Sequence, residues 1–380
     1  MKEQRRFRLR TVLLWSGGCF LLGIAAAAAI LWAVLGTRAL TLAQASWYLE
    51  NRFVAEFDRD GMVDSALSAM VDSLGDRWSY YLDPEALAQQ EIRRENQYVG
   101  AGFTFTRTQD SRMEIVAVAE GGPAEQAGLA VGDTVVAIQG EALTEENFDQ
   151  LRAVFQAEAG TEVSLTARDA QGEERELTLT LALIESDPVE SRMLEGQLGY
   201  VRLENFYHKS AQRVREATDE LAAQGARGLI FDVRQNPGGY VSELTDILDY
   251  LLPEGPIFTD ISKNGKTVVT ESDEGCVELP MVVLVDQNSY SAAEIFAAQL
   301  QESAGAGLVG QVTSGKGYYQ VTYRLLNGGA LGISIGRYGT GSGRSLIGTG
   351  LTPDVLEDDW DAQLEQAAAL LEERLSRNGG

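Results

Sequence analysis

An uncharged stretch from Thr11 to Thr37 is the feature that most constrains how this chain can fold. As an α-helix, the stretch would be about 40 Å long, enough to cross the ~30 Å hydrocarbon core of a bilayer. It follows a basic N-terminus that contains Lys2 and Arg10. Because basic flanks stay in the cytoplasm, residues 1–38 are predicted to form a cytoplasmic flank and a single-pass transmembrane anchor in the plasma membrane. The chain after Arg38 is then expected to be extracytoplasmic.

A cleaved signal peptide is the alternative interpretation of this end of the chain. Ala43-Gln44-Ala45 would serve as the cleavage site. However, the apolar part of a signal peptide is usually about 7–15 residues long, and the stretch here is far longer. We therefore favour an uncleaved signal anchor.

The balance of charge argues against nucleic acid as a partner. The 380 residues include 31 Lys and Arg against 56 Asp and Glu, which gives a formal net charge of −25. A surface this acidic repels phosphate backbones. Hydrophobic residues make up 44% of the chain, a fraction typical of globular proteins, and the length indicates two or three domains.

The chain has a single histidine, His208, and this limits the metal sites and catalytic mechanisms that are possible. It excludes metal sites that need several histidines, and we predict neither a metal nor any other cofactor. Two cysteines, Cys19 and Cys276, cannot form a disulfide framework. A Ser-His-Asp mechanism would have to use His208, but a lone histidine after a strand is most often structural, so we do not assign it as a base.

Three regions follow the anchor. Residues 39–96 carry apolar side chains at helical spacing and are predicted to form helices, with a break at Asp60-Gly61. Residues 97–185 contain short strands separated by Gly-rich turns, and residues 186–380 alternate buried strands with amphipathic helices. The pattern predicts a mainly β domain followed by an α/β domain with a parallel sheet and a C-terminal helix. The alternative for residues 39–96 is a linker or an arm that forms a homodimer.

Two strand-to-helix turns in the α/β region are candidates for a site. In the first, Gly238 and Gly239 allow backbone N–H groups to point outward at a helix N-terminus, which suits an anion or an oxyanion. In the second, Ser291 stands at the head of a helix, where α/β folds present a nucleophile. Taken alone, the first is equally an ordinary tight turn, and Ser291 with Glu294 is equally a helix capping box.

Lys316 favours the catalytic interpretation. It lies between Gly315 and Gly317 in a chain with few lysines. A serine nucleophile needs a base, and a buried lysine with a lowered pKa can take the place of histidine. The stretch Gly310–Gly317 nearly matches a P-loop, but Gly317 stands where Ser or Thr would bind Mg²⁺ and a strand is predicted to follow, so nucleotide binding is not expected.

Together these residues resemble the C-terminal processing peptidases, also called tail-specific proteases, over about residues 40–356. The motifs that carry the resemblance are Gly75-Asp76-Arg77-Trp78-Ser79-Tyr80-Tyr81-Leu82, Gly100-Ala101-Gly102-Phe103, Gly122-Pro123-Ala124, Asn236-Pro237-Gly238-Gly239, Ser289-Tyr290-Ser291-Ala292-Ala293-Glu294 and Gly315-Lys316-Gly317-Tyr318-Tyr319-Gln320. The segments around Ser291 and Lys316, taken with the Pro-Gly-Gly turn, are highly specific as a set.

The resemblance implies an α/β protease domain of the ClpP/crotonase type that is a Ser-Lys serine protease. Ser291 is then the nucleophile, Lys316 the general base and Gln320 the residue that orients the lysine. The oxyanion hole is implied to consist of backbone N–H groups, from Gly238, Gly239 and Ala292.

The resemblance also implies that residues 97–185 form a PDZ-like domain. Such a domain would bind the C-terminal tails of protein or peptide substrates by strand addition. The terminal carboxylate would be held by one loop, formed by Gly100, Ala101, Gly102 and Phe103. The chain is thus expected to be a membrane-anchored, extracytoplasmic serine endopeptidase that cleaves near the C-termini of its substrates.

Two other functions are kept as alternatives. The first is a membrane-anchored peptide-binding scaffold whose α/β domain has lost activity, which an intact Ser291, Lys316 and Gln320 argue against. The second is a crotonase-like acyl-transfer enzyme, because paired backbone N–H groups on an α/β sheet also serve thioester chemistry. The anchor and the acidic extracytoplasmic domain argue against a coenzyme A substrate.

Overall fold

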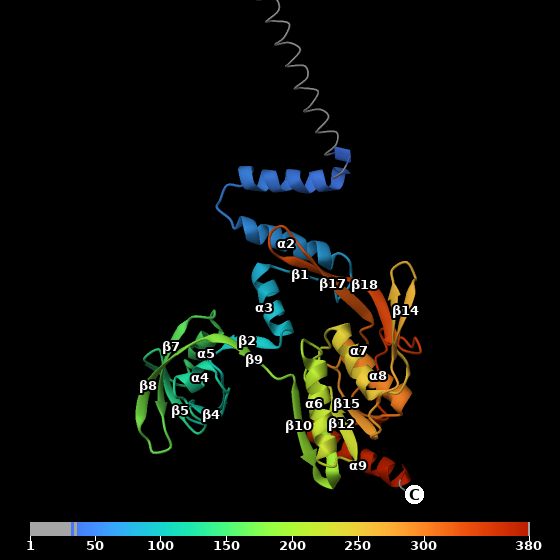
Figure 1. Ribbon diagram of the computed structural model, residues 1–380. Coiled ribbons are helices and arrows are strands. Elements are labelled where there is room, and N and C mark those ends of the chain that lie inside the picture. The colour runs from blue at the N-terminus through green and yellow to red at the C-terminus, as the bar shows by residue number, and fades with distance from the viewer. Residues whose placement is uncertain (1–31, 34–35, 379–380) are drawn as a thin grey trace, which may run out of the picture. The chain divides into compact units, whose positions relative to one another are not determined.

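The computed structural model describes residues 32–33 and 36–378 and divides at Met70 into two units (Figure 1). In the first unit, residues 36–52 are helical and α2 (Arg59–Asp72) begins seven residues after that helix ends. The break predicted at Asp60-Gly61 is therefore wrong. The carboxylate of Asp58 accepts the N–H groups of Asp60 and Gly61, so these two residues begin a helix instead of ending one.

The predicted anchor, Thr11–Thr37, lies almost entirely outside the described residues. Within the part that the structure describes, no helix combines the length and the apolar character that a bilayer crossing requires.

The PDZ-like region is an antiparallel β domain that also contains two short α-helices and one 3-10 helix. Its elements are β2 (Gln97–Gly100), β3 (Phe103–Arg107), β4 (Met113–Val118), α4 (Pro123–Gln126), β5 (Thr134–Ile138), β6 (Glu141–Ala142), α5 (Phe148–Arg152), η1 (Ala153–Gln156), β7 (Glu162–Arg168), β8 (Glu174–Thr180) and β9 (Ala182–Glu185). The main sheet has the order β3-β4-β5-β7-β8, and β2 pairs with β9. Because β3 stands at the end of this order, it offers an edge for a further strand.

The α/β region has a central sheet covered by helices on both faces. Its strands, in spatial order, are β10 (Val189–Leu194), β11 (Leu198–Leu203), β12 (Gly228–Asp232), β15 (Met281–Val285), β16 (Gly307–Gly310) and β19 (Val355–Leu356). From β11 to β19 the pairs are parallel, and β10 is an antiparallel edge. The parallel sheet predicted from the alternating pattern is thus confirmed.

Side chains alternate between the two faces of this sheet. Val201, Phe231 and Val283 pack on one face in the cluster that includes α6 (Ser210–Ala223), α7 (Val241–Leu251) and α8 (Ala292–Ala304). Their neighbours Ile230 and Val282 pack on the other face against α9 (Trp360–Asn378). The carboxyl ends of β12 and β15 are adjacent, so the two candidate turns meet at one edge.

A second sheet was not predicted. It contains β1 (Tyr80–Leu82), β18 (Ala330–Thr340), β13 (Gly255–Ser262) and β14 (Thr267–Ser272) in that order, and β17 (Tyr318–Arg324) also pairs with β18. The prediction that residues 39–96 are helical is therefore wrong at β1. Tyr80 pairs with Gly332, where a side chain would collide with the tyrosine ring, and this pairing attaches residues 80–82 to the edge of the second sheet.

Candidate active site

Ser291 stands at a sharp turn between β15 and α8. Its backbone has φ 63° and ψ −121°, a conformation that L-residues rarely adopt. The turn is attached to the first candidate turn, because the Ser289 hydroxyl donates to the carbonyl of Val233 at 2.7 Å and the Asp286 carboxylate accepts the N–H of Gln235 at 3.0 Å. Two segments that are distant in sequence thus form one rigid edge.

The Gly238-Gly239 turn approaches Ser291 so closely that only glycine fits. A Cβ on Gly238 would lie 2.8 Å from the backbone nitrogen of Ala292, and one on Gly239 would lie 2.2 Å from the carbonyl oxygen of Phe206. The N–H of Gly238 donates to the side chain of Asn236 at 2.8 Å, so it already has a partner. The N–H groups of Gly239 and Ala292 have no hydrogen-bond acceptor among the described residues, and both residues line the pocket at Ser291.

Lys316 reaches the same pocket from the loop between β16 and β17. A Cβ on Gly317 would collide with Ile347 at 2.2 Å, and one on Gly315 would lie 2.9 Å from the backbone nitrogen of Gly350, so the loop is tightly packed. The lysine Nζ lies 4.9 Å from the centre of the Trp78 ring and 5.6 Å from that of Tyr290. Burial lowers the pKa of Lys316 to about 8.

Glu294 connects the two segments. This fully buried carboxylate accepts hydrogen bonds from the N–H of Ser291 at 3.1 Å and from the N–H of Lys316 at 2.9 Å. It also accepts the N–H of Gly315 at 2.7 Å and the hydroxyl of Thr313 at 2.6 Å. Burial raises the pKa of Glu294, although these four hydrogen bonds act in the opposite direction. One side chain therefore fixes the backbone of both candidate catalytic residues.

Tyr338 is a further neighbour of both Ser291 and Lys316. Its hydroxyl donates to the carbonyl of Lys316 at 2.8 Å and also interacts with the Ser291 side chain. Its ring is buried, and burial raises the pKa of the phenol. A neutral phenol thus helps to set the distance between the two segments.

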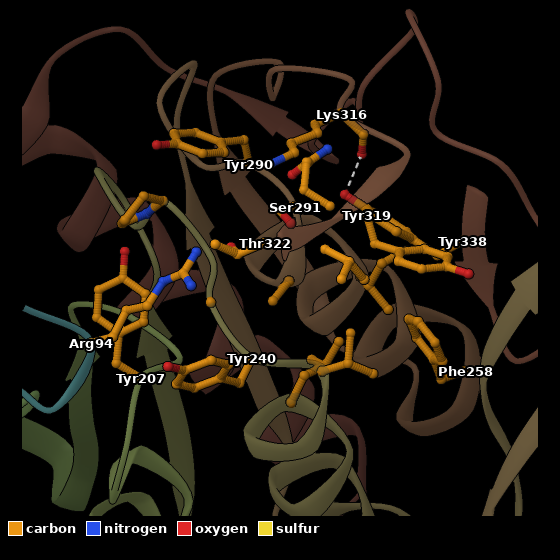
Figure 2. Close-up of a pocket in the computed structure, with 18 of the residues that line it drawn as sticks. Arg94, Tyr207, Tyr240, Phe258, Tyr290, Ser291, Lys316, Tyr319, Thr322 and Tyr338 are labelled. Atoms are coloured by element: carbon orange, nitrogen blue, oxygen red, sulfur yellow. Dashed lines mark hydrogen bonds between the residues drawn. The ribbon is translucent and has the colours of Figure 1, made fainter. Parts of the chain in front are cut away.

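The structure brings Ser291, Lys316, Gln320, Gly239 and Ala292 together around one cavity of about 470 Å³. Figure 2 shows Ser291 and Lys316 close together on one side of this cavity, with Tyr290 and Tyr338 on either side of them. The arrangement supplies a nucleophile, a base with a lowered pKa and two unpaired N–H donors, which are the components that acyl transfer needs.

Gln320 and Lys316 make no hydrogen bond with each other in the described structure. The side-chain amide of Gln320 donates instead to the carbonyl of Tyr318 and to the hydroxyl of Ser334, each at 3.0 Å. A bulge between Tyr319 and Gln320 allows both side chains to face the pocket, although consecutive strand residues normally face opposite ways. The orienting role of Gln320 stays a prediction.

His208 lies outside this pocket. Its side chain is exposed, and its backbone N–H donates to the carbonyl of Arg94 at 3.1 Å. Its carbonyl accepts the side-chain amide of Asn96 at 2.7 Å. The backbone of His208 thus links residues 94–96, which precede the PDZ-like region, to the α/β region.

The predicted peptide-binding loop runs from the end of β2 into the edge strand β3. Gly102 has φ +78°, and the carbonyls of Ala101 and Gly102 accept the N–H groups of Ala124 and Ala119. Aromatic rings line the space between β3 and the helical elements α5 and η1: Phe103 contacts Phe155, and Phe105 contacts Phe148, at ring separations of 5.2 and 6.1 Å.

Sequence reasoning did not assign four residues of this site a role: Trp78, Arg94, Glu294 and Tyr338. The capping box predicted from the spacing of Ser291 and Glu294 is confirmed, but the further bonds of Glu294 to Gly315 and Lys316 have no signal in the local sequence. Trp78 lies in the motif Gly75–Leu82, yet only the tertiary structure shows that it contacts Lys316. Arg94 carries no signal in the local sequence. Tyr338 begins the stretch Tyr338–Arg344, which resembles the family's Tyr-x-Thr-Pro-Ser-Gly-Arg pattern with a glycine in place of the proline, but this pattern assigned the tyrosine no role.

Comparison with known proteins supports the family. Residues 197–356 match the model for peptidase family S41, and residues 114–169 match a PDZ domain. The chain is 31% identical over 316 residues to a carboxyl-terminal-processing protease of Synechocystis, with 81% of this chain and 74% of that protein covered. It is 29% identical to the carboxy-terminal processing protease CtpA of Bacillus subtilis, with 81% and 66% covered. A solved structure from Bacteroides fragilis that is named for the S41 proteases has a TM-score of 0.56, with 18% identity and 88% and 94% of the two chains covered, which shows a shared fold.

Proposed function

The chain belongs to the carboxyl-terminal processing proteases of peptidase family S41, and on this basis we propose that Ser291 and Lys316 form its catalytic dyad. In this proposal the enzyme is an extracytoplasmic endopeptidase, anchored in the plasma membrane, that recognises the C-terminal tails of its substrates through the PDZ domain. The observation that carries the proposal is the convergence of Ser291 and a lysine with a pKa of about 8 on one pocket.

The reaction would start with proton transfer from Ser291 to Lys316. A neutral lysine amine accepts the hydroxyl proton as Oγ attacks the carbonyl carbon of the scissile peptide bond. The resulting oxyanion would accept hydrogen bonds from the N–H groups of Gly239 and Ala292, which lack other acceptors among the described residues. Lys316 then returns its proton to the leaving amine, and the C–N bond breaks.

Release of the acyl group would repeat these steps with water. Lys316, neutral again, accepts a proton from a water molecule that attacks the ester of Ser291. Collapse of the second tetrahedral intermediate returns the proton to Oγ and frees the new carboxyl terminus. The neighbouring aromatic rings of Trp78 and Tyr290 keep the Nζ atom in a low-dielectric environment, which supports a neutral amine near pH 8.

Tail recognition by the PDZ domain is supported by its open sheet edge. A peptide tail that pairs with β3 would satisfy the unpaired edge and place its side chains over Phe103 and Phe105. The positive φ of Gly102 turns the loop at the end of this edge, where a terminal carboxylate would lie. The two rival functions, an inactive scaffold and a crotonase-like acyl transferase, share the fold but would not cleave peptides.

Peptide cleavage by point variants tests the proposal. Ser291→Ala and Lys316→Ala should each abolish cleavage of a peptide with an apolar C-terminus while the circular dichroism spectrum is unchanged. His208→Ala is the matched control, because His208 is exposed and outside the pocket, and it should keep most of the activity. Activity of Lys316→Ala, or an inactive but folded His208→Ala, would refute the dyad.

A further inference from the structure

The catalytic pocket has two chemically different ends. One end contains the apolar ring of Phe258, and Leu244 and Ile295 also line the pocket with apolar side chains. The other end contains Arg94, and Figure 2 shows Arg94 and Phe258 on opposite sides of Ser291. A peptide that passes over Ser291 would therefore meet an apolar surface at one end and a guanidinium at the other.

Arg94 has no carboxylate partner among the described residues. Its guanidinium donates to the hydroxyl of Tyr80 at 3.4 Å and lies 5.8 Å from the centre of the Tyr240 ring. The acidic residue one turn back on the same helix, Glu91, pairs with Arg324 instead. The protein carries a net charge of −25. Glu95 follows Arg94 in the chain, but no Asp or Glu among the described residues forms an ion pair with Arg94, so its guanidinium is free to bind an anion that arrives with the substrate.

Gln90 adds a second unsatisfied group at this end. Gln90 and Arg94 are four residues apart on α3 (Pro84–Arg94), so their side chains share one face, and both line the catalytic pocket. The amide nitrogen of Gln90 donates to the hydroxyl of Tyr80 at 3.4 Å, whereas its Oε1 is buried and has no hydrogen-bond partner. A buried acceptor without a donor is unfavourable, and a peptide N–H that reached it on binding would satisfy it.

We propose that Gln90 and Arg94 form a substrate subsite in which Arg94 binds a carboxylate of the peptide and Gln90 accepts one of its N–H groups. The inference rests on the proposed function, since it assigns part of the same pocket. The carboxylate has two sources: the terminal α-carboxylate of a short tail, or an Asp or Glu side chain near the scissile bond. In both cases the subsite selects substrates by negative charge within the protease domain, separately from the PDZ domain.

The experiment compares matched peptides on three full-length enzymes in detergent: wild type, Arg94→Gln and Arg93→Gln. Arg93 is the control, because it is the adjacent arginine on α3, is exposed and does not line the pocket. One peptide pair differs by a C-terminal acid or amide. A second set replaces each residue around the scissile bond in turn with Glu or Gln. The kcat/KM value is measured for each.

In either the acid–amide pair or the Glu–Gln set, wild type and Arg93→Gln should cleave the peptide with the carboxylate better than its matched amide. We expect a kcat/KM about tenfold higher, mainly because KM is lower, as for a charge-assisted hydrogen bond. Relative to these two enzymes, Arg94→Gln should lower this preference by about tenfold, leaving any preference that the PDZ domain contributes, and should cleave the amide partner as well as wild type does. The acid–amide pair and the Glu–Gln set show which source supplies the carboxylate. Any contribution of the PDZ domain is the same in all three enzymes and cancels in the comparison.

Arg94→Glu extends the test by reversing the charge. It should prefer peptides with Lys at the position where wild type prefers Glu. If Arg94→Gln slowed the acid and amide peptides equally, Arg94 would have a purely structural role through Tyr80 and Tyr240, and the inference would be overturned while the protease function stood. If the wild-type enzyme cleaved no peptide, both proposals would fail.

Discussion

Lys316 shows how a lysine becomes suitable as a base at the scale of a single residue. Burial lowers its pKa from 10.5 to about 8, a change of about 3 kcal/mol in favour of the neutral amine. The Trp78 ring lies 4.9 Å from Nζ and has two opposite effects: it excludes water, and it attracts the ammonium ion. The cation–π attraction is worth about 2 kcal/mol at a desolvated site, and the pKa is lowered in spite of it, so exclusion of water dominates.

The pH dependence of cleavage follows from this balance. Because the active form of Lys316 is the neutral amine, kcat/KM should rise with pH and reach half its maximum near pH 8. Trp78→Ala exposes Nζ to water, which favours the ammonium ion, so the midpoint should move upward toward 10.5, the ordinary lysine value. Trp78→Phe keeps a ring in place and is the control. If the pH midpoint of kcat/KM did not move in Trp78→Ala, groups other than the Trp78 ring would be excluding water from Nζ.

At the scale of elements, helix α8 aligns the site by means of one buried carboxylate. The four groups around Glu294 are all donors: three backbone N–H groups and the Thr313 hydroxyl. Glu294→Gln replaces one carboxylate oxygen with an amide nitrogen, which cannot accept a hydrogen bond. Two of these donors would then have no acceptor. We expect a loss of about 2–4 kcal/mol in the free energy of unfolding and at least a hundredfold loss in kcat.

Chemical denaturation and single-turnover kinetics measure these two effects. Glu302→Gln is the matched control on the same helix, because Glu302 forms a surface ion pair with Arg344 and should change stability by less than about 1 kcal/mol. Equal stability losses in Glu294→Gln and Glu302→Gln would mean that the buried carboxylate does not hold the two catalytic segments in place.

The same elements explain what could and could not be predicted from the sequence. The parallel strands and the helices that follow them have local periodicity, so the sheet and the turns at Gly238 and Ser291 were predictable. The strand β1 is only three residues long and forms because Gly332 of β18 leaves room for Tyr80, a contact across 252 positions that no local pattern contains. For the same reason, the contacts of Lys316 with Trp78 and Glu294 could not be predicted, although each of the three residues lies in a motif that the sequence shows.

At the scale of the whole molecule, the chain should be attached to a membrane by its N-terminus. The uncharged stretch Thr11–Thr37 behind a basic flank motivates this expectation, and it lies almost entirely outside the described residues. After cell fractionation, the intact protein should be found with the membranes and should resist extraction by high salt or alkaline carbonate. N-terminal sequencing checks the competing interpretation, because a soluble product that begins at Ser46 would show cleavage after Ala45.

Two parts of the chain, the Arg94 subsite and the PDZ loop, are expected to bind a negatively charged group of a peptide. Binding experiments can measure their contributions separately. In Ser291→Ala, which cannot cleave, Arg94→Gln removes the proposed subsite of the protease domain and leaves the PDZ loop intact. In this double variant a peptide with a free C-terminus and an apolar last residue should still bind along β3. Its amidated form should bind about 1.5–3 kcal/mol more weakly, because the amide carries no charge for the N–H groups near Gly102 and Phe103. Deletion of residues 98–184 from the double variant should remove this difference.

Isothermal titration calorimetry measures the affinity of the double variant for the acid and for the amide form of the peptide. Equal affinities for acid and amide would assign the loop a structural role and would locate tail recognition in the α/β region.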